Sequence, residues 1–254
     1  MCVGTTESAI VLQNKHTSMN VQIAVVDASL GDTPAERNLT REIDADTTVY
    51  KASEGEIPPT PGRRDGEYDA VVISGSQTAA YADRGWIHEL TAWARSTQRA
   101  DVPMLGICWG HQFLAQAFGG RVVEMDEYEI GYREIEQRGD DPLFAGLTDP
   151  MIAFQTHSDR VAELPAGAVE LGRNDYGIQA FRQGASYGLQ FHPEYDRQTA
   201  EWILESKDLA ADTHEAVAAT ITDDNVAAAT ETATLFDNFL AIVADHTRQP
   251  SQPW

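Results

Sequence analysis

The chain has 254 residues, enough for one sizeable α/β domain with an addition. Its 40 acidic and 18 basic residues give a formal net charge of −22, and a surface this acidic repels nucleic acids and anionic membranes. We therefore expect no nucleic-acid partner and no membrane partner. No apolar run approaches the roughly 18 residues that a membrane span needs, and the N-terminus has no long hydrophobic core, so we expect neither a membrane span nor a secretion signal.

The N-terminal part begins with a polar stretch, residues 1–18, that we expect to be a disordered leader, with Met19 as an alternative start. Apolar runs then predict buried strands at 21–26, 47–50 and 70–73. Strands that are apolar almost throughout are typical of a sheet covered on both faces.

The next segments alternate between helix and strand. Apolar residues at helical spacing predict a helix around 86–94, and a short apolar strand follows at 103–107. A second helix starts after Cys108 and is expected to stop at the glycine pair 119–120. This alternation predicts an α/β fold with a mostly parallel sheet and helices on both faces.

The second half predicts shorter strands and then helices. The strands are expected at 122–123, 131–135, 152–155, 169–172, 178–181 and 187–191, with one short helical piece near 141–146. From residue 198 onward the pattern is helical again. We therefore predict one domain at 19–197 and a helical C-terminal extension at 198–254.

Cys108 lies between two glycines at a strand-to-helix junction, in the segment Gly-Ile-Cys-Trp-Gly at 106–110. Such a nucleophile elbow lifts a side chain out of the sheet toward the first N–H groups of the following helix, whose dipole favours a thiolate. The alternative is a small buried hydrophobic residue, which most free cysteines are.

A second motif, Gln-Phe-His-Pro-Glu at 190–194, favours catalysis. The strand period of two predicts that His192 and Glu194 point to the same side. A histidine that takes a proton from a thiol and returns it to a leaving amine needs a fixed tautomer, which a neighbouring carboxylate can provide.

Together these segments resemble the signature of class I glutamine amidotransferases. The first reads Pro-Met-Leu-Gly-Ile-Cys-Trp-Gly-His-Gln at 103–112 and the second is the motif at 190–194. The similarity extends over about 22–195. It implies a three-layer, flavodoxin-like fold and a catalytic triad of Cys108, His192 and Glu194.

The resemblance also implies the residues around the triad. Backbone N–H groups of Gly75 or Ser76 and of Trp109 would form the oxyanion hole. Gln112 and the segment Thr156, His157 and Ser158 would bind the substrate. A Gly-Ser sequence in place of the Gly-Gly-Pro of many relatives, with Tyr81 following, resembles the stand-alone GMP-synthase-like branch, which includes γ-glutamyl peptidases.

The remaining histidines and acidic residues give weaker indications of function. We expect His111 to be structural and His157 to tether a turn with Asp159, with substrate binding as the alternative. The acidic stretch at 124–129 lacks the ligand spacing of a metal site and is expected to be a solvated edge. No metal and no cofactor are predicted.

Three functions stay open. The chain is a glutaminase that releases ammonia from glutamine for a partner synthase, a self-sufficient γ-glutamyl peptidase or hydrolase, or a non-catalytic binding relative. The first is preferred, and no nucleotide-binding loop is present to use the ammonia in the same chain.

The cysteine content indicates the compartment. The two cysteines, one of them at position 2, make a poor disulfide framework, so we expect a reducing cytoplasm. The chain has only three lysines and 40 acidic residues, a composition that resembles proteins from cells with a salt-rich cytoplasm. The alternative is an acidic protein from an ordinary mesophile.

Overall fold

The computed structural model describes residues 21–61 and 68–248. The leader predicted at 1–18 lies outside the described residues. In these two ranges, nine strands form one mixed sheet in the order β2-β1-β3-β4-β9-β8-β7-β5-β6. Their bounds are β1 (Gln22–Asp27), β2 (Asp46–Lys51), β3 (Ala70–Ile73), β4 (Met104–Ile107), β5 (Arg121–Gln137), β6 (Met151–Glu163), β7 (Val169–Asn174), β8 (Gly177–Gln183) and β9 (Ser186–Leu189).

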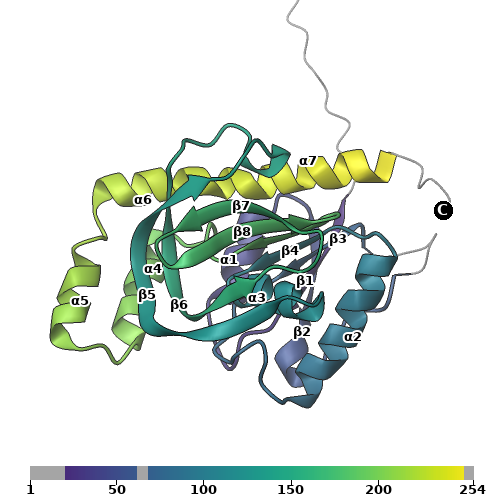
Figure 1. Ribbon diagram of the computed structural model, residues 1–254, viewed down its shortest axis with the longest axis horizontal. Helices are drawn as coiled ribbons and strands as arrows, with labels where there is room; N and C mark the ends of the chain where they lie inside the picture. Colours follow the sequence, from purple (N-terminus) through teal and green to yellow (C-terminus); the bar gives the residue numbers. More distant parts are fainter. Residues whose placement is uncertain (1–20, 62–67, 249–254) are drawn as a thin grey trace, which may run out of the picture.

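The sheet has a parallel part and an antiparallel part. Strands β2, β1, β3, β4 and β9 run parallel to one another, as the strand–helix alternation predicted. Strands β8, β7, β5 and β6 continue the sheet with antiparallel pairing, and β5 and β6 form a long hairpin. The nucleophile segment follows β4, near the middle of the sheet (Figure 1).

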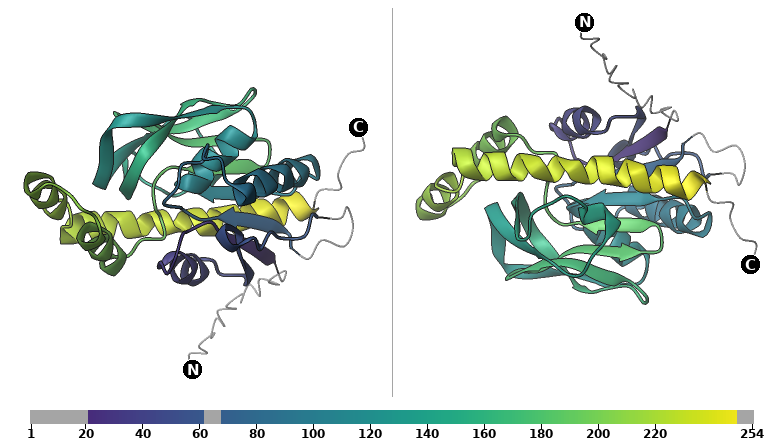
Figure 2. Two further views of the ribbon diagram at one scale, coloured as in Figure 1. Left: turned by 90° about the horizontal axis from the view of Figure 1, so that it is seen from below. Right: turned by 90° about the horizontal axis from the view of Figure 1, so that it is seen from above.

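Helices cover both faces of the parallel part (Figures 1 and 2). The helices of the described residues, including those that pack elsewhere, are α1 (Ala35–Glu42), α2 (Gly85–Arg99), α3 (Trp109–Ala117), α4 (Arg197–Ser206), α5 (Ala211–Ala218), α6 (Asp223–Thr230) and α7 (Thr234–Arg248). Along β1, Ile23 packs in one core cluster with α1 and α7, whereas Ala24 packs in the other with α2 and α3. This period of two confirms the predicted three-layer α/β fold.

The C-terminal helices pack on the rest of the chain. In α7, Phe236 and Phe239 are each 1% exposed and lie in the core under the sheet. Helices α4, α5 and α6 cover β5 and β6 through a third cluster, which includes Ile203 and Phe154. The stretch Asp223–Arg248 is long and apolar enough to cross a membrane by length and composition. Its residues Phe236 and Phe239, however, are buried in the core under the sheet.

The structure departs from the predicted elements at four places. Helix α1 was not predicted. The strands expected at 122–123 and 131–135 are one strand, β5, with an irregular register between Glu124 and Glu129. Strand β9 ends at Leu189, so the predicted strand does not reach the histidine motif. The expected helical piece near 141–146 is a short 3-10 turn, Pro142–Phe144.

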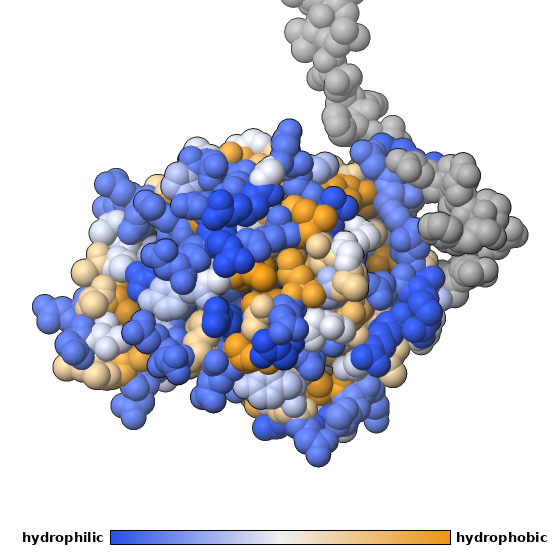
Figure 3. All heavy atoms as spheres, in the orientation of Figure 1, coloured by the Kyte–Doolittle hydropathy of each residue, from blue (hydrophilic) through white to orange (hydrophobic). Residues whose placement is uncertain are grey.

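Hydrophilic residues cover most of the face seen in Figure 3, in keeping with the acidic composition. Apolar residues on this face gather toward its centre.

Candidate active site

Cys108 joins β4 to α3 in a backbone conformation that few residues adopt. Its φ of 51° lies in the left-handed region, where a non-glycine residue costs about 1–3 kcal/mol. Its N–H donates to Leu189 O at 2.7 Å, and its carbonyl accepts the first helical bond of α3, from Gln112 N at 3.1 Å. The strained residue is therefore held at both ends.

The flanking glycines make this bend possible. A Cβ on Gly106 would meet the backbone of Gly110, and a Cβ on Gly110 would lie 2.5 Å from Ile73 O. Strand β3, the elbow and helix α3 therefore approach one another too closely for any larger residue. This is the geometry that the nucleophile-elbow pattern predicts.

His192 reaches the site from a loop after β9. Its N–H donates to Phe154 O at 3.0 Å in an isolated bridge to β6. Its ring Nδ1 lies 2.8 Å from Glu194 Oε1, and both side chains are buried. The pairing of the two side chains agrees with the expectation, but its predicted cause, a strand period of two, is wrong because the strand has already ended.

The ring of His192 is arranged to hold a proton. Burial opposes its charge, but the nearby Glu194 and Cys108 outweigh that effect and raise the pKa of His192 well above its usual value. Its Nε2 is buried and has no hydrogen-bond partner among the described residues. The ring of Tyr195 stacks on it at 4.0 Å between centroids and 18° between planes. Tyr195 was not predicted as a site residue, although it directly follows the motif.

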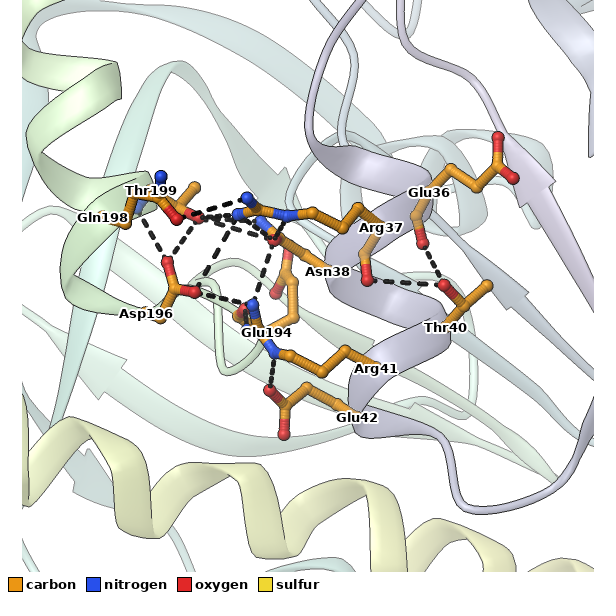
Figure 4. Close-up of polar contacts among 10 residues, drawn as sticks. All are labelled: Glu36, Arg37, Asn38, Thr40, Arg41, Glu42, Glu194, Asp196, Gln198 and Thr199. Carbon is orange, nitrogen blue, oxygen red and sulfur yellow. Dashed lines mark hydrogen bonds and ion pairs between the residues drawn. The ribbon is translucent and has the colours of Figure 1, made fainter.

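A polar network from α1 supports Glu194 (Figure 4). Arg41 Nη2 donates to the backbone oxygen of Glu194 at 2.6 Å, and its Nη1 lies 2.7 Å from Asp196 Oδ2. Asp196 in turn caps α4, because its Oδ1 accepts from Thr199 N at 2.8 Å. Figure 4 shows Arg37 and Asn38 of α1 reaching the start of α4 beside it.

The loop after β3 places Gly75 against Cys108 and His192. A Cβ on Gly75 would lie 3.3 Å from His192 Cε1 and 3.8 Å from Cys108 Cβ. Ser74 anchors this loop, since its Oγ accepts from Ala28 N at 2.9 Å. The Oγ of Ser76 is buried without a partner among the described residues. The loop thus borders the space in front of the thiol.

Trp109, the other predicted oxyanion residue, is the first residue of α3. Trp109 is 1% exposed, and its ring stacks on Phe113 at 4.9 Å and lies 5.4 Å from the tilted ring of Trp86. This packing fixes the first turn of α3, where N–H groups have no intrahelical partner. The residue is therefore positioned to present its N–H beside Cys108.

Strand β6 forms another wall of the site. Thr156 O lies 3.9 Å from Cys108 Sγ, and Thr156 Oγ1 lies 2.7 Å from the hydroxyl of Tyr128. Gln112 is 4% exposed, and its Nε2 donates to Asp159 O at 2.8 Å and to Gln190 Oε1 at 3.0 Å. Gln112 thus ties α3 to this wall.

His157 joins the wall to a buried acid. Its Nδ1 lies 2.9 Å from Asp159 O, which agrees with the predicted tether, and its Nε2 lies 2.9 Å from Glu129 Oε2. Glu129 is 0% exposed and also accepts from Asn174 Nδ2 at 2.6 Å. The expectation of a solvated acidic edge is therefore wrong for Glu129, which the register irregularity of β5 turns inward.

His111 is fully buried and packs on the ring of Phe181 at 5.1 Å. Burial lowers its pKa to about 3, so it is neutral and suited to packing. Within residues 21–61 and 68–248, no group of three or more His, Cys, Asp or Glu side chains could hold a metal ion.

The predicted site residues meet at one cavity of about 360 Å³. Its lining includes every one of them: Gly75, Ser76, Cys108, Trp109, Gln112, Thr156, His157, Ser158, His192 and Glu194. Trp202 and Lys207, from α4 and its C-terminal end, also line it and were not predicted. The arrangement places a thiol, a proton-holding imidazole and a buried carboxylate in one accessible cavity, as nucleophilic catalysis on a carbonyl requires.

Comparisons with known proteins agree with this geometry. The model of the family "Glutamine amidotransferase class-I" matches residues 24–207. A glutamine-hydrolysing GMP synthase of Vibrio vulnificus is 33% identical over 132 residues, 50% of this chain and 24% of that protein. The corresponding protein of Thermosipho melanesiensis is 35% identical over 142 residues, 54% of this chain and 26% of that protein. The match thus spans about a quarter of these relatives.

Solved structures share the fold. A glutamine amidotransferase from Thermotoga maritima has a TM-score of 0.72 at 24% identity, with 88% of this chain and 98% of that one covered. One from Methylobacillus flagellatus has a TM-score of 0.74 at 22% identity, with 92% and 98% covered. Because the family model covers well over half of its residues, the chain belongs to the class-I glutamine amidotransferases.

Proposed function

We propose that the chain is a glutaminase that releases ammonia from glutamine through a γ-glutamyl thioester on Cys108. The observation that carries the proposal is that Cys108 and His192 line one cavity beside Gly75, while His192 Nδ1 lies 2.8 Å from Glu194 and its Nε2 has no hydrogen-bond partner among the described residues. A structural cysteine does not require this arrangement.

In the first step the thiolate of Cys108 attacks the side-chain amide carbon of glutamine. The amide oxygen gains negative charge, which the N–H groups of Trp109 and of Gly75 or Ser76 would stabilise. One such donor is worth about 2.7–4 kcal/mol of barrier. The C–N bond then breaks, and the protonated His192 gives its proton to the departing nitrogen, which leaves as ammonia.

In the second step water hydrolyses the thioester. Neutral His192 takes a proton from the water, whose oxygen adds to the γ-carbonyl carbon, and the C–S bond breaks to regenerate Cys108. Glutamate is released. Glu194 keeps Nδ1 protonated through both steps, so that Nε2 alone exchanges the proton with the reactants.

The ammonia acceptor belongs to a separate partner in this proposal. The relatives named as GMP synthases are described as glutamine-hydrolysing, and the match covers about a quarter of each. A synthase working in trans, GMP-synthase-like in its chemistry, is therefore the proposed partner. The reducing cytoplasm expected from the cysteine content is part of the same proposal.

The test replaces each cysteine in turn and is run in dilute buffer and in molar salt, since an excess of 22 negative charges is screened by salt. Wild type and Cys2→Ser should release ammonia from glutamine and be labelled by a glutamine-derived chloroketone. Cys108→Ser should do neither, with an unchanged circular dichroism spectrum. Ammonia release by Cys108→Ser would refute the proposal.

The same assay separates the rival functions. Hydrolysis of γ-glutamylglycine at a higher kcat/KM than glutamine would identify a γ-glutamyl peptidase. Inertness toward both substrates in both buffers, with and without cell extract, would identify a non-catalytic relative.

A further inference from the structure

Lys207 stands at the mouth of the catalytic cavity. It is the residue that ends α4, it is half-buried, and its side chain lines the cavity. Its Nζ lies 5.4 Å from the centroid of the Tyr128 ring, within the range of a cation–π contact. No other lysine or arginine among the described residues lines this cavity.

The ammonium of Lys207 has no carboxylate partner in the part of the chain that the structure describes. By contrast, Lys51 pairs with Asp27 at 2.7 Å. A partly desolvated cation that faces a cavity without a counter-ion can pair with an anion of the ligand.

Besides Glu194, two carboxylates line the same cavity from other elements. Glu124 comes from β5 and Asp159 from β6, and the hydroxyl of Tyr81 lies 3.5 Å from Asp159 Oδ1. Burial and the charge of Glu124 raise the pKa of Asp159, and the opposing effects of the Tyr81 hydroxyl and of His157 offset them only in part. An ammonium group of the ligand would stabilise the Asp159 carboxylate further. The cavity therefore carries charges of both signs near the nucleophile, which fits a zwitterion.

Continuous contacts link Lys207 to the thiol. Its ammonium sits over the ring of Tyr128, the Tyr128 hydroxyl lies 2.7 Å from Thr156 Oγ1, and Thr156 O lies 3.9 Å from Cys108 Sγ. A γ-glutamyl group has its reacting carbonyl at one end of a short aliphatic chain and its α-carboxylate and α-ammonium at the other. A substrate laid along this wall brings its α-carboxylate toward Lys207 when its γ-carbonyl meets Cys108.

We propose that Lys207 binds the α-carboxylate of the γ-glutamyl substrate and selects for it, while Asp159 and Glu124 receive the α-ammonium. The assignment rests on the proposed function for the identity of the substrate. It makes the C-terminal end of α4 part of the substrate site. Lys207 is a specificity-determining residue here and takes no part in the proton transfers.

The test compares substrates that differ only at the α-carboxylate. Lys207→Met should raise KM for L-glutamine about 10–100-fold with kcat changed less than about threefold, the loss of one charge-assisted hydrogen bond. KM for L-glutaminamide, in which an amide replaces the α-carboxylate, should not change. Lys207→Arg should retain most of the affinity for glutamine.

A matched control removes another cation that has no carboxylate partner among the described residues. Arg99 is exposed at the end of α2, donates to Ser96 Oγ at 2.9 Å and does not line the cavity, so Arg99→Met should leave both KM values unchanged. If the role of Lys207 at the helix terminus is purely structural, Lys207→Met should lower the melting temperature and change KM for glutamine and for glutaminamide equally. That outcome would overturn the assignment.

Calorimetric titration of glutamine into Cys108→Ser, with and without Lys207→Met, separates this inference from the proposed function. Binding that weakens about 10–100-fold with the second substitution supports the inference even if the wild type turns over no glutamine. Turnover that is insensitive to Lys207→Met refutes the inference and leaves the glutaminase proposal intact. A KM effect confined to γ-glutamylglycine, absent with γ-glutamyl methylamide and glutamine, would assign Lys207 to the leaving group and overturn the proposal.

Discussion

Glu194→Gln removes a charge from the proposed triad while preserving its shape. Glu194 Oε1 lies 2.8 Å from His192 Nδ1, and the two side chains are 4% and 3% exposed. A glutamine at this position has nearly the same volume, and its carbonyl oxygen can still accept from Nδ1. The substitution therefore tests the carboxylate charge separately from the packing.

Loss of the charge should slow catalysis strongly. Burial disfavours the charged imidazole, and without the Glu194 carboxylate the pKa of His192 should fall toward or below its usual value. The proton that should pass to the leaving nitrogen is then absent at neutral pH. General acid–base catalysis typically contributes about 10²–10⁴-fold, so kcat/KM for glutamine should fall by that factor, about 2.7–5.5 kcal/mol of barrier.

The same substitution should change how stability depends on pH. The pKa of His192 is higher in the folded protein than the usual 6.5, so folding favours its protonated form. That contribution is complete below about pH 6.5 and decreases as the pH rises through the folded-state pKa. Wild type should therefore lose stability over this alkaline range, and Glu194→Gln should lose less.

The measurements are ammonia release from pH 5 to 10, urea unfolding at the same pH values, and NMR titration of the histidine ring. Glu201→Gln is the control, because Glu201 is 53% exposed in an i, i+4 pair with Arg197 and lies outside the cavity. It should change activity by less than a factor of two. A Glu194→Gln enzyme with wild-type kcat/KM and an unchanged His192 pKa would show that the carboxylate does not control the base.

Two further predictions concern the supports of the site. Arg41→Met removes the hydrogen bond to the backbone oxygen of Glu194. It should lower kcat by about tenfold and the free energy of unfolding by about 1–3 kcal/mol. Arg121→Met, at an exposed position, should change each of these quantities only slightly. Equal kcat losses in both would contradict the positioning role. Glu129→Gln replaces a fully buried carboxylate that accepts from Asn174 and faces His157, and it should cost about 1–3 kcal/mol in urea unfolding. Glu163→Gln, at a position that is 65% exposed, should cost at most about 1 kcal/mol, and similar losses in the two variants would show that the buried carboxylate is not needed for stability.

The residues of the two motifs could be predicted because their geometry is local. Gly106 and Gly110 lie within two positions of Cys108, and the close approaches that require glycine there involve the adjoining strand and helix. His192 and Glu194 are also only two positions apart, so the local backbone alone can bring their side chains within reach. The predicted pairing therefore holds even though the strand assumed to cause it ends at Leu189.

Helix α1 illustrates what could not be predicted. Its sequence, Ala-Glu-Arg-Asn-Leu-Thr-Arg-Glu, has a single large apolar residue, Leu39, so it lacks the apolar periodicity by which helices are recognised. Arg41 in this helix contacts Glu194, 153 positions away. Nothing near either residue in the sequence indicates that contact, because the packing of the whole sheet brings the two together.

Strand β5 shows a similar limit. The acidic residues at 124–129 interrupt the apolar pattern, and their composition favours a solvated edge. The register irregularity between Glu124 and Glu129 reverses the alternation of side chains, so Glu129 turns inward to His157 while Glu124 lines the cavity. A one-residue change of register moves side chains to the opposite face, and composition does not record where it occurs.

These cases divide the site into two parts with different origins. The proposed reacting groups come from short segments whose own sequence determines their geometry, and these are the segments that the resemblance to the family rests on. Arg41 and Lys207, which support and border those groups, come from α1 and from the end of α4, segments that carry no motif. Relatives can therefore share the attack of a thiol on a γ-glutamyl carbonyl while differing in which γ-glutamyl compound they accept. If Lys207→Met changes KM without changing kcat, that division holds for this protein.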